Sequence, residues 1–305
     1  YSITFIVCLF FVYLLTEKIV LTLSWNYFTN IARETMPYAV IYFLMTTYYR
    51  IDGVMLEKLQ GANGAAESGI YAQGYRIMEA LNNIGYLFAG ILLPLFSYRI
   101  AQKLEIKSLL KSGFSIIYCV AVAIIIGLFT YKQDIIKILY STTADVGYSA
   151  EVFGYLLLNF FPVALLYVVG TLLTANKNFK WMIYTLLLAV MLNISLNFYL
   201  ITNFGAKGAG IATLITQLFM LVCYSVYCIR IFNLSFSIKY FTQLFAYASL
   251  CLMAIYFLSK QCFSTNNLYD LAIHIACYFA FIPFITFLSG LINKQTFQLK
   301  VGVDK

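Results

Sequence analysis

The sequence PYAVIYFLMTTYYRIDGVML (37–56), followed by SGIYAQGYRIMEALNNIGYLFAGILLPLF (68–96), decides the fold. Each segment is long enough to cross a bilayer as an α-helix, which needs about 20 predominantly apolar residues. The short stretch between them predicts a helical hairpin. Both segments carry charged side chains: Arg50 and Asp52 in the first, Arg76 and Glu79 in the second. An ionised side chain at the bilayer centre costs about 2.5–3.5 kcal/mol, so these four should face protein or water rather than lipid.

Apolar residues dominate the whole chain of 305 residues, of which 62% are hydrophobic and only 10% are charged. A soluble domain carries about 25% charged residues. Apolar runs of about 20 residues recur along the chain, and the alternating ten-residue segments of a membrane β-barrel do not. The sequence therefore predicts an all-α, polytopic transmembrane bundle.

Nine spans are predicted, at 1–16, 36–57, 68–95, 112–131, 151–174, 181–202, 209–229, 240–259 and 270–292. The segment 17–35 mixes apolar, aromatic and charged residues and indicates an amphipathic interfacial connector, with Trp25 and Tyr27 at the headgroup level. The first apolar run has no basic flank and no small-residue cleavage site, so it does not resemble a signal peptide. We expect further spans before residue 1.

The number of lysine and arginine residues differs between the two sets of alternate loops. Thirteen Lys and Arg lie in the set 17–35, 96–111, 175–180, 230–239 and 293–305, and five lie in the set 58–67, 132–150, 203–208 and 260–269. The positive-inside rule places the first set and the C-terminus in the cytoplasm. The net charge of +8 thus indicates membrane topology rather than binding to nucleic acid. The loops are too short for a soluble catalytic domain.

One face of the second hairpin segment is polar. At 100° per residue, a sector about 140° wide contains Tyr71, Tyr75, Arg76, Glu79, Asn82 and Asn83. We expect this stripe to line a water-filled cavity; the structural alternative is a satisfied network between helices. Because the two segments run antiparallel, Asp52 and Arg76 should meet and form an ion pair. Arg50 or Arg76 is then available to an anionic ligand, since the planar guanidinium matches phosphate oxygens. Asp52 and Glu79 are candidates for coupling to a proton or cation.

The remaining polar residues within spans favour structural roles. Asn193, Asn197 and the glycine-bearing turn 203–217 are typical of contacts between helices, and Asn159 and Gln217 have the same interpretation. His274 is the only histidine, so it cannot contribute to a multi-histidine metal site, and we expect it to be a satisfied intramembrane residue rather than a proton relay.

Two further features concern proline and cysteine. Pro162 and Pro283 lie inside their spans, where each permits a static bend or a hinge. The seven cysteines form no CxxC motif and favour small buried side chains over disulfides or metal ligands.

Two blocks of residues resemble a known family. The first comprises Pro37, Arg50–Ile51–Asp52, Met55–Leu56, Gly69–Ile70–Tyr71, Ala72, Tyr75–Arg76, Leu81 and Pro94, and the second runs from Asn193 to Asn197 and from Gly205 to Thr213. Together they are similar to the polysaccharide-biosynthesis, Wzx-type oligosaccharide flippases of the multidrug/oligosaccharidyl-lipid/polysaccharide (MOP) exporter superfamily. The hairpin resembles the seventh and eighth helices of that family.

The resemblance implies a domain organisation. Residues 1–35 would be the last span of a first lobe with its connector, 36–230 the second six-helix lobe, and 231–305 two additional spans with a cytoplasmic tail. It also implies a multi-pass protein of the bacterial inner membrane that moves undecaprenyl-diphosphate-linked oligosaccharide, an O-antigen or capsule repeat unit, by alternating access.

In that family setting, Arg50 and Arg76 would bind the diphosphate, and Tyr71, Tyr75, Asn82 and Asn83 would bind the sugar. No cofactor is implied, and a proton or sodium gradient is a candidate driving force. The implied partners are membrane lipids and the polysaccharide polymerase machinery, and not nucleic acid.

Three alternatives stay open. Lipid II flippases and drug or organic-cation antiporters share the architecture. An antiporter should have unpaired acids in its cavity, whereas each acid here has an arginine nearby. A membrane-embedded polysaccharide polymerase or ligase should have a large outer loop with arginine or histidine, and the longest outer loop, 132–150, has only Lys132 and Lys137 as basic residues.

Overall fold

The computed structural model describes residues 2–15, 24–140, 145–261 and 268–291, and every regular element within these ranges is a helix. The chain forms two units, Tyr1–Val40 and Ile41–Lys305. The boundary falls within a long helix, and each unit is described by itself.

The first unit contains α1 (Ser2–Leu15) and the beginning of α2 (Trp25–Leu59). At 1.5 Å per residue, the 14 residues of α1 rise only about 21 Å, less than the thickness of a hydrocarbon core. Within the predicted connector 17–35, the residues from Trp25 onward are helical and form the first turns of α2, and their interfacial position stays a prediction. Residues 16–23 lie outside the described part of the chain.

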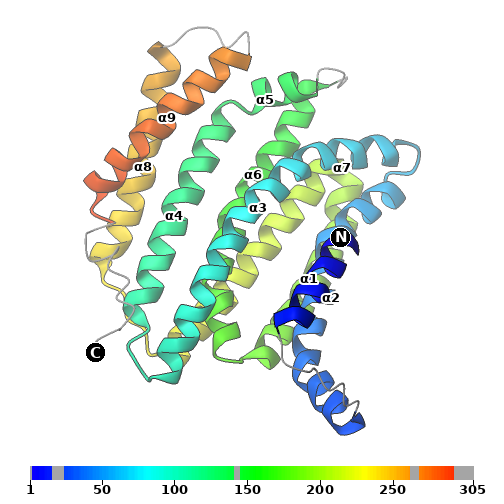
Figure 1. Cartoon of the computed structure of the whole chain (residues 1–305). Coiled ribbons are helices and arrows are strands. Elements are labelled where there is room, and N and C mark those ends of the chain that lie inside the picture. The colour runs from blue at the N-terminus through cyan, green and yellow to red at the C-terminus, as the bar shows by residue number, and fades with distance from the viewer. Residues whose placement is uncertain (1, 16–23, 141–144, 262–267, 292–305) are drawn as a thin grey trace. The chain divides into compact units, whose positions relative to one another are not determined.

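The second unit is a helical bundle built around α6 (Val146–Ala175). After α2 come η1 (Gly61–Asn63), α3 (Gly64–Ala101), α4 (Lys107–Thr130), α5 (Lys132–Leu139), α6, α7 (Phe179–Ile231), α8 (Ile238–Gln261) and α9 (Leu268–Ser289). Helix α6 packs against α3, α4, α5 and α7, while α8 and α9 pack against each other and against α4 (Figure 1). The most apolar stretch of α6 is 72% buried, against 22% in α8 and in α9, so α6 is the core helix.

Two glycines of α3 permit its close packing against α6. A Cβ atom at Gly74 would lie 2.9 Å from Leu156 Cδ1, and one at Gly85 would lie 2.3 Å from the ring of Tyr167. At Gly85 a larger side chain would displace the Tyr167 ring or force α3 away from α6, whereas at Gly74 the end of the Leu156 side chain would have to shift.

Helix α7 reverses direction at Gly205. Its backbone there has φ 58° and ψ −135°, outside the helical region and favourable only for glycine. The two halves run back along each other, because Asn193 Nδ2 donates to Thr213 Oγ1 at 3.5 Å. The predicted spans 181–202 and 209–229 therefore exist, but they meet at a single residue rather than through a loop.

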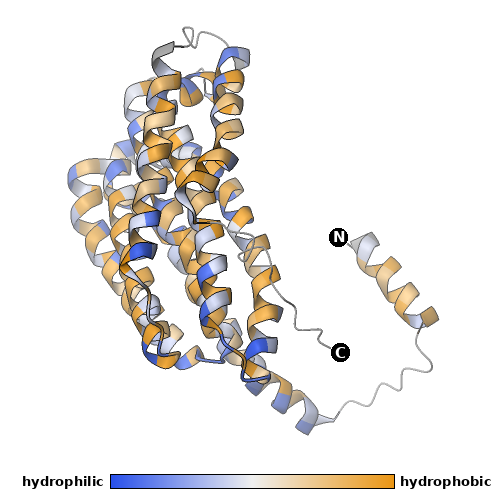
Figure 2. Ribbon diagram, turned by 90° about the vertical axis from the view of Figure 1, so that its left-hand side faces the viewer, coloured by the Kyte–Doolittle hydropathy of each residue, from blue (hydrophilic) through white to orange (hydrophobic). Residues whose placement is uncertain are grey.

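Six helices in the described part of the chain are long and apolar enough to cross a membrane. They are α3, α4, α6, α7, α8 and α9, and the reversal of α7 gives it two passes. Helix α2 is not among them. Hydrophobic residues predominate along these helices (Figure 2), and many of the large ones are exposed, which suits a lipid environment. The prediction of an all-α, multi-spanning membrane bundle is confirmed.

Candidate substrate and ion site

The α2–α3 hairpin turns tightly through η1. A Cβ atom at Gly64 would lie 2.2 Å from the carbonyl oxygen of Glu57, so this turn requires glycine. The turn brings Asp52, on the buried face of α2, against Tyr71 of α3, whose hydroxyl donates to Asp52 Oδ2 at 2.8 Å.

Asp52 also joins the hairpin to both halves of α7. From the first half, Asn197 Nδ2 donates to Asp52 Oδ1 at 2.7 Å, and from the second half, Thr213 Oγ1 donates to Asp52 Oδ2 at 2.5 Å. Asn197 Nδ2 also donates to Asn193 Oδ1 at 3.0 Å. The Asp52 side chain is only 2% exposed. We refer to Asp52, Tyr71, Asn193, Asn197 and Thr213 as the Asp52 network.

The predicted Asp52–Arg76 ion pair is wrong. The described residues place no lysine or arginine nitrogen within 4 Å of Asp52, and Arg76 lies on the exposed side of α3. A buried carboxylate is stable only when its lone pairs are satisfied, and here hydroxyl and amide donors from α3 and α7 do so in place of the arginine.

Arg50 pairs instead with Glu79. Their closest atoms, Arg50 Nη2 and Glu79 Oε1, are 3.8 Å apart, and the two side chains are 73% and 48% exposed. Asn83 is exposed on the same helix as Glu79, and its Nδ2 donates to the Glu79 carbonyl oxygen at 3.2 Å. The charged part of the predicted stripe therefore lies on an open face of the second unit.

The less polar part of the stripe faces inward, onto a small cavity beside Asp52. Its volume of about 20 Å³ is room for about one water molecule or ion, and its lining includes Tyr71, Tyr75, Asn82 and Asn159. The amide oxygens of Asn82 and Asn159 are buried and have no hydrogen-bond partner within the described ranges.

A larger cavity of about 190 Å³ adjoins the first. The two share Tyr48, Tyr49, Val163 and Gln217 in their linings. Tyrosine and methionine side chains from α2, α6 and α7 dominate the larger one: Met45, Tyr48, Tyr49, Tyr167, Met182, Met220 and Tyr224.

The Asp52 network offers only oxygen ligands for a cation. It supplies one carboxylate, the Thr213 hydroxyl and the side-chain oxygens of two asparagines, and oxygen sets of this kind suit hard cations. One carboxylate balances a single positive charge. Among the described residues no group of three or more His, Cys, Asp or Glu side chains forms a transition-metal site.

Comparison with known proteins places the chain in a family. The family profile described as "Lipid II flippase MurJ" matches residues 65–280, more than two thirds of the chain. The chain belongs to the lipid II flippase MurJ family. A comparison with curated protein sequences gives no match.

Solved structures of MOP transporters have the same fold. A lipid II flippase MurJ in an inward closed conformation superimposes with a TM-score of 0.67 at 17% identity, over 92% of this chain and 58% of that one. A MOP superfamily transporter from Pyrococcus furiosus gives 0.54 at 20% identity, and an outward-facing MATE family multidrug transporter gives 0.55 at 18%, each over 85% of this chain and 61% of the other. The chain thus spans about three fifths of the length of these transporters.

These comparisons decide several predictions. Membership of the MurJ family confirms the MOP superfamily and the membrane location. They leave the Wzx-type substrate, the orientation of the C-terminus and the roles of individual site residues as predictions.

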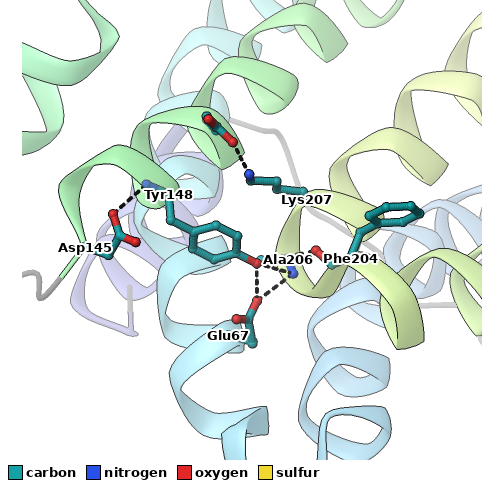
Figure 3. Close-up of polar contacts among 7 residues, drawn as sticks. Glu67, Asp145, Tyr148, Phe204, Ala206 and Lys207 are labelled. Atoms are coloured by element: carbon teal, nitrogen blue, oxygen red, sulfur yellow. Dashed lines mark hydrogen bonds and ion pairs between the residues drawn. The ribbon is translucent and has the colours of Figure 1, made fainter.

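A second carboxylate of the hairpin contacts the turn of α7, and sequence reasoning missed it (Figure 3). Glu67 Oε2 accepts from the Tyr148 hydroxyl at 2.6 Å and from the Ala206 N–H at 2.7 Å. The carboxylate thereby caps the second half of α7 where that half begins. Lys207 forms an ion pair with Glu151 and lies 5.0 Å from the Tyr148 ring centroid. We refer to Glu67, Tyr148 and Ala206 as the Glu67 cluster.

His274 and the cysteines lie apart from the Asp52 network. His274 is 6% exposed and its ring lies 5.9 Å from that of Tyr131. Its Nδ1 has no hydrogen-bond partner within the described ranges, so the predicted satisfied environment is wrong for that atom. The cysteines that the structure describes are free, and three of them, Cys119, Cys228 and Cys251, are buried. Cys262 lies outside these ranges.

Proposed function

We propose that this chain is the larger part of a flippase that moves a polyprenyl-diphosphate-linked saccharide across the bacterial inner membrane by alternating access. The observation that carries the proposal is the exposed charged face of the α2–α3 hairpin. Arg50 lies nine residues before the end of α2 at Leu59, about 14 Å along the helix axis. That distance is close to half the thickness of a hydrocarbon core of about 30 Å.

Charges at this depth need water or protein beside them. Arg50, Arg76 and Glu79 would together cost several kcal/mol if they faced lipid. A hydrated chamber between this unit and a further lobe of a complete transporter would solvate them and would give the two arginines access to a diphosphate. Arginine suits this role because it stays charged and binds phosphate oxygens in pairs.

The neighbouring groups suit the sugar. Asn83 is exposed on the charged face and provides an amide group, and Tyr75, which is only partly buried, provides aromatic surface. Asn82 lines the small cavity, which has no room for a sugar, and Tyr71 donates to Asp52 and positions that carboxylate. The proposed division is a second lobe at 36–230 and two additional helices at 231–305.

The family description makes lipid II the first cargo to test. An O-antigen or capsule repeat unit is the second, because the residues of the hairpin resemble those of Wzx-type flippases. Both cargoes require the same arginines for the diphosphate, so the arginine variants test the mechanism and the choice of lipid tests the cargo.

The decisive experiment is translocation in proteoliposomes that contain the complete protein. We expect the double variant Arg50→Gln/Arg76→Gln to lose at least about tenfold in the initial rate, since two charge-assisted contacts are worth well over 1.4 kcal/mol. Arg230→Gln, an exposed arginine at the end of α7, is the matched control and should retain the wild-type rate. Unchanged translocation by the double variant would remove the arginines from the mechanism.

We also propose that the Asp52 network binds the coupling ion, with Na⁺ favoured over a proton by its all-oxygen composition. Asp52→Asn removes the only negative charge of the network and nearly preserves its shape. The variant should abolish stimulation of transport by a sodium gradient. Glu79 is the alternative coupling residue, and Glu79→Gln should then have that effect instead.

We propose that the C-terminus lies in the cytoplasm, and the distribution of basic residues among the loops supports this orientation. Cysteine labelling tests it in a protein without native cysteines. Position 64 is unsuitable because any side chain there meets the Glu57 carbonyl. Ala62→Cys should react with an impermeant reagent from outside and Leu104→Cys should not; the reverse result inverts the topology.

A further inference from the structure

A basic pocket lies at the end of the bundle where α3 passes into α4. Its volume is about 440 Å³, and the segment joining α7 to α8 forms its other wall. The cationic lining residues are Arg99, Lys103 and Lys107, and Glu105 is the one acid in the lining. This pocket lies at the end of α3 opposite the turn of the α2–α3 hairpin, and its role does not depend on the proposed cargo.

Neutral oxygen atoms orient two of the three cations. Arg99 Nη1 donates to the Glu105 carbonyl oxygen at 2.8 Å and to Ser108 Oγ at 2.9 Å, and Lys107 Nζ donates to Ser235 Oγ at 3.1 Å. The described residues place no carboxylate within 4 Å of these cations. These hydrogen bonds hold the Arg99 and Lys107 side chains in place, and no carboxylate of the described residues pairs with their positive charges.

The first turn of α4 adds to the positive potential. Helix α4 starts at Lys107, and the preceding residue, Ile106, has no side-chain cap. Glu105, Ile106 and Lys107 all line the pocket. The uncapped N–H groups and the helix dipole both favour an anion here.

An apolar groove continues from the basic pocket. It has a volume of about 190 Å³, and Leu234 lines both spaces. Side chains from α4, α7 and α8 form its walls, among them Leu110, Phe114, Cys228, Phe241 and Leu244. A ligand that fills both spaces has an anionic head and a hydrocarbon chain.

We propose that this pocket and groove bind one anionic glycerophospholipid, with its phosphate between Arg99, Lys103 and Lys107 and the first part of an acyl chain in the groove. The position supports this occupant, because α3 ends at Ala101 and α4 begins at Lys107, which puts the pocket at the level of the headgroups. Basic pockets between helices on the cytoplasmic side attract lipids of this charge.

Native mass spectrometry of the full chain in detergent tests the site, with phosphatidylglycerol, phosphatidylcholine and inorganic phosphate as probes. Lys103→Gln/Lys107→Gln should weaken phosphatidylglycerol binding about 10- to 30-fold. Lys177→Gln/Lys180→Gln is a closely matched control. Lys103 and Lys177 both have φ 55°, and Lys107 and Lys180 both lie in the first turn of a helix. The control should change binding less than about twofold.

The groove has its own test. Ser225→Phe fills the groove from α7 and should weaken binding of long-chain phosphatidylglycerol while leaving the short-chain lipid unaffected. An unchanged midpoint of thermal unfolding confirms that the variant is folded.

Three results would overturn the proposal. Equal losses in the two lysine pairs would indicate a diffuse field rather than a site. Equal binding of phosphatidylcholine would remove the role of headgroup charge. If inorganic phosphate binds the pocket by itself and displaces phosphatidylglycerol, the pocket is a site for free phosphate.

Discussion

Asp52 and Glu67 are two carboxylates of one hairpin, and both contact α7, but their surroundings differ. Asp52 is buried seven residues before the end of α2, accepts from both halves of α7, and adjoins a cavity. Glu67 is half-buried at the start of α3 and accepts from the backbone N–H that follows the reversal of α7. We infer that the first carboxylate is placed to exchange its donors for an ion, whereas the second holds a helix end. The same chemical group thus has a binding role in one place and a structural role in the other.

The largest effect is expected from Asp52→Leu. The variant leaves the Tyr71, Asn197 and Thr213 donors unsatisfied, and each costs about 1–3 kcal/mol, so the free energy of unfolding should fall by about 3 kcal/mol or more. Denaturant unfolding in mixed micelles measures it. Asp52→Asn is the control and should lose less, since its amide oxygen still accepts. Equal free energies of unfolding for Asp52→Leu and wild type would show that the Asp52 network does not stabilise the fold.

Gly205→Ala should lower the free energy of unfolding by about 2–3 kcal/mol. Alanine is strained at this backbone conformation, and its Cβ would lie 2.5 Å from Glu67 Oε2. The double variant with Glu67→Ala separates the two causes. If the clash dominates, the double variant recovers stability, and if backbone strain dominates, the two losses add.

Glu67→Gln should cost about 1.5 kcal/mol, because it replaces two charge-assisted hydrogen bonds with weaker neutral ones. A double-mutant cycle with Tyr148→Phe should give a coupling energy of about 1 kcal/mol. A coupling near zero would mean that Glu67 acts through Ala206 alone. Sodium-stimulated transport by the folded Glu67→Gln protein should be unchanged, in contrast to Asp52→Asn.

The smallest effect on stability is expected from Arg50→Gln. Its ion pair with Glu79 is exposed and 3.8 Å long, and such pairs contribute less than about 0.5–1 kcal/mol. The loss in translocation should nevertheless be large. A loss of stability comparable to that of Asp52→Leu would show that the arginine is a structural residue.

Much of the fold followed from the sequence, because the length and hydropathy of a segment determine whether it can cross a bilayer. The hairpin, the reversal after residue 202 and the bundle were predictable on this basis. The bounds of α2 were not, since nothing in the local sequence separates an interfacial helix from the start of a longer one.

The site was predicted less well. Tyr71, Tyr75 and Asn82 of the polar stripe line a cavity with room for about one water, and their role in binding stays a prediction. Helical angles within one hairpin gave Asp52 the wrong partner. Of the true donors, Tyr71 belongs to the hairpin, and Asn197 and Thr213 belong to a third helix, α7. A signal for them exists: Asn197 and Thr213 each lie eight residues from Gly205, so a reversal there brings both to the same depth. The Glu67 cluster has no comparable signal, because Tyr148 is 81 residues away from Glu67 along the chain.

The reversal of α7 has a mechanical consequence. The two halves of α7 meet at Gly205 without a flexible loop between them. A tilt of one half is therefore transmitted directly to the other. The Glu67 carboxylate binds the backbone at this junction, and Asp52 accepts hydrogen bonds from both halves farther along. A displacement of the α2–α3 hairpin would therefore move both halves of α7 together.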